Sequence, residues 1–365
     1  MMSDLKWMQY ALQLAQKARP ISPPNPSVGC VFVRDGELLG EGFTQRVGSD
    51  HAEIQAVKDA YRRGHDLKGA TAYVTLEPCS HYGRTPPCAL RLIKEKVARV
   101  VVACLDPNPL VAGRGIALLR ENGIEVQTGL LEKEAWLINA GFMTRMQQQR
   151  PWVRMKVAMS MDGLTALPNG KSQWITGEQA RNDGHRYRSF SGAIITGIGT
   201  VLVDNPQMNV RLNNQLALRQ PLKVLLDSHL RVSSQARLFE DGHVLVVCTE
   251  SDEQKVQNLQ SVGAEVLCLP GENGQVDLSA LLRELARREI NDVHIEAGAT
   301  LNGAFLQADL VDEMVIYIAP KFLGQGRQAW NLPVIEDLNQ LTSWHLQQYD
   351  KVGDDMRLVL LRKEK

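Results

Sequence analysis

The sequence lacks an excess of either charge, since 41 lysine and arginine residues balance 41 aspartate and glutamate residues. It also has no basic tail and no segment rich in lysine and arginine. Contacts to a nucleic-acid backbone need clustered positive charge. We therefore expect no nucleic-acid partner.

Long apolar runs are also missing. No stretch approaches the roughly 20 apolar residues of a membrane-spanning helix, and residues 1–18 form an amphipathic helix pattern without the features of a signal peptide. Six cysteines in 365 residues do not indicate a disulfide framework. We expect a soluble, cytoplasmic protein with no membrane partner. Four cysteines in apolar, strand-like runs are expected to be core residues: Cys30, Cys104, Cys248 and Cys268.

Strand-like and helix-like segments alternate along the whole chain, which predicts an α/β fold. Asp35-Gly36 is typical of a two-residue β-hairpin turn, and the sheet after this hairpin is expected to be mostly parallel. Residues 132–149 are expected to form one helix, and a new alternation starts at Trp152. The length favours two domains, so we place them at 1–149 and 150–365.

The most informative motif is His51-Ala52-Glu53, followed by Pro78-Cys79 and then Cys88. This order is typical of zinc deaminases. One imidazole and two thiolates hold Zn²⁺ with its fourth position open, and the metal lowers the pKa of a bound water to about 7, so that hydroxide becomes available. Residues 51–63 predict a helix, which places His51 and Glu53 in its first turn. Glu53 would take the water proton and pass it to the ring nitrogen and the departing ammonia.

The spacing departs from the usual pattern, because eight residues separate the two cysteines instead of two. A loop through residues 80–87 must therefore return Cys88 to the metal. His81 is a second candidate ligand, ranked below His51 because no acid lies at a suitable spacing from it. Isolated histidines and cysteines are often core residues, but the combination favours catalysis.

The C-terminal half contains two glycine segments after strands, residues 196–200 and 296–303. Glycines there let a cofactor approach the backbone, and helix N–H groups can hold a pyrophosphate. Taken alone, each segment is more typical of an ordinary turn. Asp162, Asp204 and Asp227 also follow strands, where they indicate either turn chemistry or the rim of a pocket.

Eight segments from both halves together resemble one family, the bifunctional deaminase–reductases of riboflavin biosynthesis. The segments are PNPSVGCV (24–31), HAE (51–53), TLEPCSHYGRTPPC (75–88), DPNPLVAGRG (106–115), MSMDG (159–163), SQWIT (172–176), TVLVDNP (200–206) and EAGATLNGAFL (296–306). The resemblance covers nearly the whole chain, and the family also has the eight-residue gap between the cysteines.

The resemblance implies a cytidine-deaminase-like N-terminal domain and a dihydrofolate-reductase-like C-terminal domain. The first would deaminate 2,5-diamino-6-(5-phosphoribosylamino)pyrimidin-4(3H)-one, a pyrimidine nucleotide, by zinc-dependent hydrolysis. The second would reduce the ribosyl group of the product to ribityl with NADPH. The implied cofactors are one Zn²⁺ per deaminase domain and NADPH, and the implied assembly is a homo-oligomer, either a dimer or a tetramer.

The resemblance also assigns residues to ligands. The deaminase substrate would contact Asn25, Asp106 and Asn108. The reductase substrate would contact Ser172, Arg188, Met208, Arg211 and Glu296, and arginine suits its phosphate. NADPH would contact Met159, Trp174, Thr200, Asp204, Ser228, Gly298, Ala299, Thr300, Leu301, Asn302 and Gly303. For Trp174, core packing is the competing interpretation.

Two other functions compete with this one. A nucleic-acid base deaminase with an unrelated C-terminal module shares the HAE and PC motifs, but a basic face and a tight C-x-x-C are expected there and are missing here. A structural zinc protein needs a fourth protein ligand, for which His81 is the obvious candidate. Substitution of Glu53 separates these cases, because a structural site does not depend on it.

Overall fold

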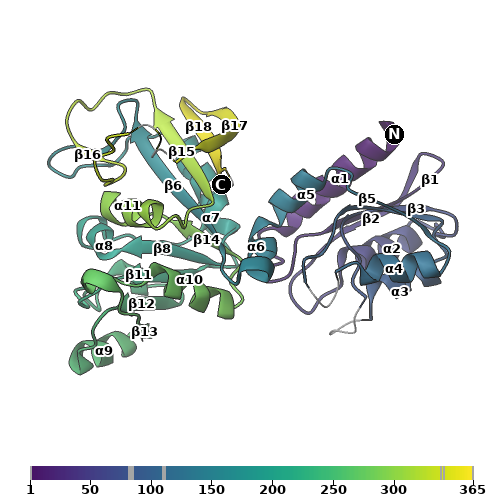
Figure 1. The fold of residues 1–365 in the computed structure, drawn as a ribbon, viewed down its shortest axis with the longest axis horizontal. Helices are drawn as coiled ribbons and strands as arrows, with labels where there is room; N and C mark the ends of the chain where they lie inside the picture. The colour runs from purple at the N-terminus through teal and green to yellow at the C-terminus, as the bar shows by residue number, and fades with distance from the viewer. Residues whose placement is uncertain (1, 81–85, 109–111, 338, 340–341, 364–365) are drawn as a thin grey trace. The chain divides into compact units, whose positions relative to one another are not determined.

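The structure is a computed structural model that describes residues 2–80, 86–108, 112–337, 339 and 342–363 (Figure 1). Two compact units divide the chain, Met1–Gln149 and Arg150–Lys365. Each unit contains a sheet with helices packed on it. The predicted α/β class is therefore confirmed in both units.

The first unit is built on a five-stranded sheet of order β2-β1-β3-β4-β5. β1 pairs antiparallel with β2 and β3, whereas β3, β4 and β5 are parallel, as the sequence predicted. The hairpin turn at Asp35-Gly36 is confirmed. The strands are β1 (Gly29–Arg34), β2 (Glu37–Phe43), β3 (Thr71–Leu76), β4 (Arg99–Cys104) and β5 (Glu125–Thr128).

Helices cover both faces of this sheet, with α1 and α5 on one side and α2, α3 and α4 on the other (Figure 1). The helices are α1 (Met2–Ala18), α2 (Ala52–Arg62), α3 (Cys88–Lys94), α4 (Arg114–Glu121), α5 (Glu132–Ile138) and α6 (Ala140–Gln148). The single helix predicted over 132–149 is wrong, because the chain breaks at Asn139. That side chain accepts a hydrogen bond from Ser27 N (2.7 Å) and donates one to Ser27 O (3.0 Å), so tertiary contacts outweigh helix continuity.

Two glycines bring α2 unusually close to the sheet. A β-carbon on Gly40 would lie 2.5 Å from the carbonyl oxygen of Ala56, and one on Gly42 would lie 2.4 Å from the Ala56 nitrogen. Neither position has space for a side chain. The helix backbone therefore packs directly on β2, and this contact fixes where the first turn of α2 stands.

The second unit contains a nine-stranded sheet of order β13-β12-β11-β8-β14-β6-β15-β18-β17. The strands from β13 to β15 are parallel, and β15, β18 and β17 pair antiparallel. The strands are β6 (Trp152–Ser160), β8 (Ala193–Gly197), β11 (Leu222–Leu226), β12 (Val244–Cys248), β13 (Glu265–Cys268), β14 (Asp292–Ile295), β15 (Glu313–Ala319), β17 (Trp344–Val352) and β18 (Asp355–Arg362).

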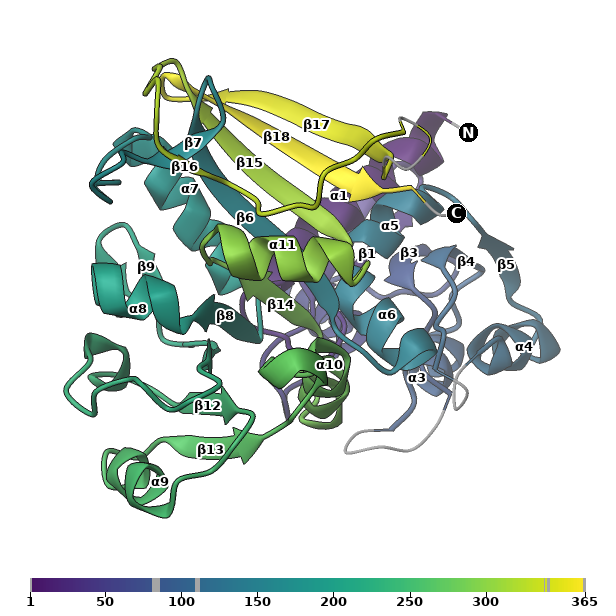
Figure 2. The same cartoon turned by 60° about the vertical axis from the view of Figure 1, so that its left-hand side comes forward.

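The helices of the second unit connect these strands, and α11 lies across the middle of the sheet near β14 and β6 (Figure 2). The helices are α7 (Glu178–Ser189), α8 (Ile198–Asp204), α9 (Glu253–Gln260), α10 (Leu278–Arg287) and α11 (Ala299–Gln307). Two short ribbons pair β7 (Leu164–Ala166) with β16 (Arg327–Gln328) and β9 (Arg211–Leu212) with β10 (Gln215–Leu216).

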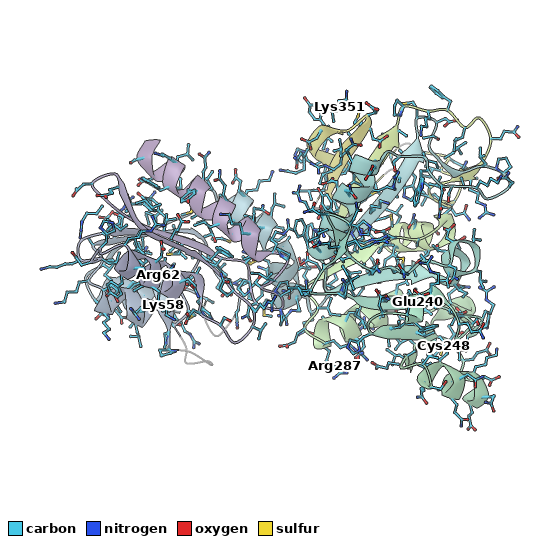
Figure 3. The ribbon with its side chains drawn as sticks, turned by 180° about the vertical axis from the view of Figure 1, so that it is seen from behind. Lys58, Arg62, Glu240, Cys248, Arg287 and Lys351 are labelled. Atoms are coloured by element: carbon cyan, nitrogen blue, oxygen red, sulfur yellow. The ribbon has the colours of Figure 1, made fainter. Side chains whose placement is uncertain are left out.

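Burial agrees with three of the four predicted core cysteines. Cys30, Cys104 and Cys248 are buried, but Cys268 is exposed because β13 is an edge strand. Charged side chains such as Lys58 on α2 project outward (Figure 3). Among the helices of the described residues, none combines the length and apolar character needed to cross a bilayer.

Candidate active sites

Three metal-ligating side chains meet in the first unit. The Nδ1 atom of His51 lies 3.3 Å from Sγ of Cys88 and 3.7 Å from Sγ of Cys79, and all three atoms lie within 4.8 Å of one another. Within the described ranges this is the one such group of histidine, cysteine or acidic side chains. Both sulfurs thus face the same imidazole nitrogen, as ligands of one tetrahedral ion must.

Three different elements bring these ligands together. His51 is the N-cap of α2, Cys79 follows β3, and Cys88 is the first residue of α3. The backbone N–H of Cys88 donates to Sγ of Cys79 at 3.3 Å. A helix N-terminus stabilises a thiolate, so the start of α3 supports both sulfur ligands.

The close contacts change the proton affinities of the group. The hydrogen bond from the Cys88 thiol lowers the pKa of Cys79 to about 4, while that hydrogen bond and burial raise the pKa of Cys88. The hydrogen bond with Cys79 raises the pKa of His51 to about 9. A divalent cation would displace these protons, because its ligands are thiolate and neutral imidazole. The three residues therefore fit a zinc ion.

Glu53 lies in the first turn of α2 and is buried, with 4% of its surface exposed. Burial raises its pKa to about 7, and the negative charge of Cys79 acts in the same direction. A carboxyl group with such a pKa exchanges a proton at neutral pH. Glu53 is not part of the ligand group, but its carboxyl group hydrogen-bonds the Cys88 thiol, so it stands beside the metal position as an acid or base.

The competing ligand His81 lies outside the described residues. Among the residues that the structure does describe, no fourth histidine, cysteine or carboxylate joins the group. The described part of the site therefore fits a metal with three protein ligands.

The predicted deaminase substrate residues belong to segments at one edge of the sheet. Asp106 and Asn108 follow β4, which runs parallel to β3, so both segments leave the same edge as Cys79. Asn25 precedes β1, whose first residue, Gly29, donates from its N–H to Oγ1 of Thr75 near the end of β3 (3.1 Å). The topology thus places all three on the metal side of the sheet. Their contact with substrate stays a prediction.

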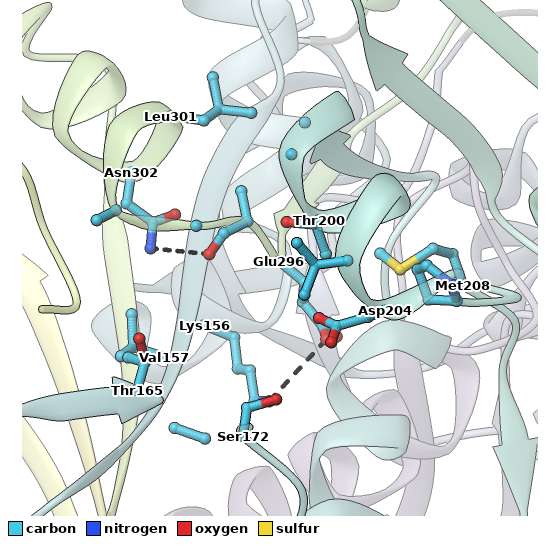
Figure 4. Close-up of a pocket in the computed structure, with 18 of the residues that line it drawn as sticks. Lys156, Val157, Thr165, Ser172, Thr200, Asp204, Met208, Glu296, Leu301 and Asn302 are labelled. Carbon is cyan, nitrogen blue, oxygen red and sulfur yellow. Dashed lines mark hydrogen bonds and ion pairs between the residues drawn. The ribbon is translucent and has the colours of Figure 1, made fainter. Parts of the chain in front are cut away.

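The second unit contains a cavity of about 1870 Å³ (Figure 4). A typical ligand pocket has about 300–1,000 Å³, so this one has space for a dinucleotide together with a substrate. Most of the predicted reductase residues line it: Ser172, Trp174, Arg188, Thr200, Asp204, Met208, Arg211, Ser228, Glu296, Gly298, Ala299, Thr300, Leu301 and Asn302.

Met159 and Gly303 do not line this cavity. Met159 packs against the central apolar cluster of the sheet. A β-carbon on Gly303 would lie 2.0 Å from the carbonyl oxygen of Asn331, so this glycine serves a close backbone contact. Neither observation supports a contact with NADPH.

An ion cluster forms the floor of the cavity around Glu296. Arg188 donates from Nε and Nη2 to the two carboxylate oxygens at 2.5 and 2.8 Å, and Nζ of Lys156 lies 3.9 Å from Oε2. Burial alone would raise the pKa of Glu296, but the charges of Arg188 and Lys156 outweigh it and hold that pKa well below its usual range. Burial lowers the pKa of Lys156. Arg188 also donates to the carbonyl of Asn209 at 2.8 Å, so its donors are largely committed to the protein.

Arg211 is exposed at the cavity wall. Its backbone N–H donates to Nδ1 of His185 at 3.1 Å. Burial, followed by the charge of Arg188, lowers the pKa of His185 to about 4. His185 is therefore neutral at neutral pH, and Nδ1 remains an acceptor that orients the Arg211 segment.

The three aspartates that follow strands, Asp162, Asp204 and Asp227, do not all have the same role. Asp162 accepts hydrogen bonds from the N–H groups of Leu323 and Gly324, and Asp227 accepts one from the N–H of Val232. The bond of Asp227 is local turn chemistry, whereas Asp162 holds the backbone of a segment far away in sequence. Asp204 lines the cavity instead.

Trp174 is 62% exposed, so core packing is the wrong interpretation for it. The guanidinium of Arg181 lies 4.4 Å from its ring centroid, and both residues line the cavity. The indole thus offers an aromatic face to a ligand.

Sequence reasoning gave no role to Lys156 or His185, which both line the cavity. Lys156 lies in the central strand β6, where charged side chains are uncommon, and this signal was available in the sequence. His185 lies three residues before Arg188 on a strongly polar helix, where nothing in the sequence distinguishes it from an exposed residue.

Comparisons with known proteins agree with this division. The model of the "RibD C-terminal domain" matches residues 151–358, and that of the "cytidine and deoxycytidylate deaminase zinc-binding region" matches residues 1–104. The second match contains His51, Cys79 and Cys88. The first contains every residue named above for the cavity.

Relatives match over nearly the full length. The riboflavin biosynthesis proteins RibD of Haemophilus influenzae and Escherichia coli are each 44% identical, covering 99% of this chain and 98% and 100% of their own length. The solved structure of Acinetobacter baumannii RibD, form 1, has a TM-score of 0.89 at 44% identity, covering 100% of this chain and 99% of that one. A Thermotoga maritima structure titled as a diaminohydroxyphosphoribosylaminopyrimidine deaminase/5-amino-6-(5-phosphoribosylamino)uracil reductase has a TM-score of 0.87 at 32% identity, covering 99% of both chains.

Proposed function

The chain belongs to the RibD family of riboflavin-biosynthesis proteins, and from this premise we propose which of its residues perform the two reactions of that family. The protein is a bifunctional enzyme with a deaminase and a reductase activity, and its cofactors are Zn²⁺ and NADPH. We assign the deaminase to residues 1–149 and the reductase to residues 150–365. The substrate is a small molecule, the pyrimidine nucleotide 2,5-diamino-6-(5-phosphoribosylamino)pyrimidin-4(3H)-one.

In the first reaction, His51, Cys79 and Cys88 would hold the zinc ion. When bound there, Zn²⁺ would supply the Lewis acidity that makes water a nucleophile at neutral pH. Glu53 takes a proton from the attacking water and passes it to the ring nitrogen. It then takes the proton of the added hydroxyl group and gives it to the amino group, which leaves as ammonia while the carbonyl forms. Asn25, Asp106 and Asn108 orient the pyrimidine.

In the second reaction, the cavity of the second unit holds substrate and cofactor side by side. NADPH supplies the hydride, and the protein supplies orientation and electrostatics. Arg211 binds the substrate phosphate, because its guanidinium is exposed at the wall while that of Arg188 is bound to Glu296. Lys156 stands beside Glu296 with a lowered pKa, so it is placed to assist proton transfer as the sugar opens.

Positive charge and helix N-termini in the cavity lining favour the phosphates of the cofactor. The first turns of α8 and α11, at Thr200 and Ala299, line the cavity together with Ser228, Arg231 and Arg237. N–H groups at helix starts and guanidinium groups both stabilise phosphates. We assign the NADPH phosphates to this region.

The observation that carries the deaminase proposal is the imidazole nitrogen within 3.7 Å of two thiol sulfurs, beside the buried Glu53. The test incubates the protein with the diaminopyrimidinone nucleotide, with and without NADPH, and follows ammonia and cofactor absorbance together. Ammonia should appear in both samples, and NADPH should be consumed after it. Oxidation of NADPH without release of ammonia would contradict the order of the two steps.

We also propose a cytoplasmic homo-oligomer, either a dimer or a tetramer. All six cysteines are free thiols, which fits a reducing compartment. The edge strand β17 carries Leu346 and Tyr349, which are 49% and 72% exposed, and an exposed edge of this kind is suited to pairing with a second copy. Sedimentation of the purified protein tests the assembly, and a monomer at all concentrations would exclude it.

A further inference from the structure

Glu77 is a buried carboxylate that the reactions above do not use. Only 4% of its surface is exposed. Its Oε2 accepts hydrogen bonds from the backbone N–H groups of Asp106 (3.4 Å) and Gly113 (3.0 Å), and its Oε1 accepts them from Gly115 (3.0 Å) and Ile116 (3.4 Å). Four backbone N–H groups therefore donate to a single side chain, and that side chain follows a different element, β3.

These donors identify Glu77 as the cap of α4. The N-cap of this helix is Gly113, which has no side chain to offer, while the second and third helical residues, Gly115 and Ile116, both donate to Glu77. An N-cap side chain ordinarily accepts from these two positions. Here the acceptor comes from the end of β3, and its negative charge lies at the positive end of the helix.

The contact between the two elements is tight. A β-carbon on Gly115 would lie 2.0 Å from the carbonyl oxygen of Pro78. The first turn of α4 therefore rests directly on the backbone between Glu77 and the zinc ligand Cys79. The first turn of α4 and the segment that contains Cys79 therefore pack directly against each other, and the Glu77 side chain lies between them.

The segment fixed in this way contains the proposed substrate residues. Asp106 donates its N–H to Glu77, and Asn108 donates its N–H to Oδ1 of Asp106 at 2.8 Å. The positions of both side chains thus depend on the Glu77 carboxylate. We propose that Glu77 is a positioning residue of the deaminase, which sets the distance between the Asp106–Asn108 segment and the metal ligands. This inference rests on the function proposed for the first unit.

The test is Glu77→Gln in the full-length protein. The amide keeps one acceptor oxygen, loses the charge and turns an NH₂ group toward N–H donors. The KM of the deaminase substrate should rise roughly tenfold or more, and kcat should change much less. Zinc content and the kinetics of the reductase with deaminated substrate should stay unchanged, and both report that the chain is folded.

The matched control is Glu121→Gln, which removes an exposed carboxylate from the last turn of the same helix and should leave the deaminase KM unchanged. Glu77→Asp keeps the charge with a shorter reach, so it should have a KM between those of the wild type and Glu77→Gln. It is also the variant to measure if Glu77→Gln does not fold. Unchanged deaminase kinetics in the folded Glu77 variants would overturn the inference, and so would loss of zinc. Failure of the wild-type protein to release ammonia would instead refute the proposed function.

Discussion

The two sites differ in how much of the protein each one needs. In the first unit, the proposed chemistry needs only three ligand atoms within 4.8 Å of one another and one buried acid. In the second unit, the walls of a cavity of about 1870 Å³ come from most of the sheet's connections. A metal ion that activates water needs only a few protein side chains around it. Hydride transfer needs a site that holds two large ligands and orients them toward each other. Loss of one metal ligand or of Glu53 should therefore nearly abolish the deaminase activity, whereas loss of one cavity residue should only weaken the reductase activity.

Removal of zinc should have the largest effect, because it should abolish the deaminase activity and leave the reductase activity unchanged. A chelator should abolish ammonia release, because the ion that we propose at His51, Cys79 and Cys88 is the one that activates water. Reduction of deaminated substrate should continue at its original rate, and added Zn²⁺ should restore the deaminase. Equal loss of both activities would show that the metal supports the whole chain.

Glu53→Gln should lower deaminase kcat by roughly 10²–10⁴-fold, the usual contribution of a general acid–base group. The amide has nearly the same shape but carries no exchangeable proton of suitable pKa. Zinc content and reductase kinetics serve as controls in the same sample. A variant that keeps its deaminase activity would show that the assignment of Glu53 as the acid–base group is wrong.

Arg211→Ala should raise the KM of the reductase substrate roughly 10- to 100-fold through loss of a charge-assisted contact to phosphate. The KM of NADPH should change little. The matched control is Arg283→Ala, an exposed arginine of α10 that does not line the cavity. Equal effects of Arg211→Ala on both KM values would argue against phosphate recognition by this residue.

The smallest effect concerns the pH dependence of stability in the second unit. The pKa of His185 is about 4 in the folded protein and 6.5 is its ordinary value, so the unfolded chain binds more protons between these values. The free energy of unfolding should therefore rise with pH through this window. The contribution of His185 to it should be fully present above about pH 6.5 and should be lost as the pH falls toward 4. Because the side chain is partly exposed, we expect about 1–2 kcal/mol.

Denaturant unfolding at pH 4.5 and 7.5, compared between wild type and His185→Asn, measures this effect. Asparagine keeps an acceptor for the Arg211 N–H and does not titrate. Burial also lowers the pKa of His294, but that residue is present in both proteins and cancels in the difference. The same pH dependence in both proteins would assign it to another group.

Local signals in the sequence were enough for most of the fold around the first site. The hairpin at Asp35-Gly36 and the helix that follows His51 were both predicted within about two residues, because turn chemistry and apolar periodicity act over short distances. The break at Asn139 was missed, since its cause is a pair of hydrogen bonds to Ser27, far away in sequence.

The second unit was less predictable. Residues 196–200 were expected to be a glycine loop, but Ile198 already begins α8. Strand β17 was missed because its side chains are mostly polar and exposed, so it has no apolar alternation to detect. The ion pair between Arg188 and Glu296 could not be predicted from the sequence either, because these residues are 108 positions apart.

The fluorescence of Trp174 should report ligand binding in the second unit. The indole stands in the open beside Arg181 at the rim of the cavity, where a planar ring could stack on it. Occupancy of the cavity therefore alters the polarity around one fluorophore, and comparison with Trp174→Phe isolates its emission from that of the other five tryptophans. Ligand titrations can thus be followed by intrinsic fluorescence without any label.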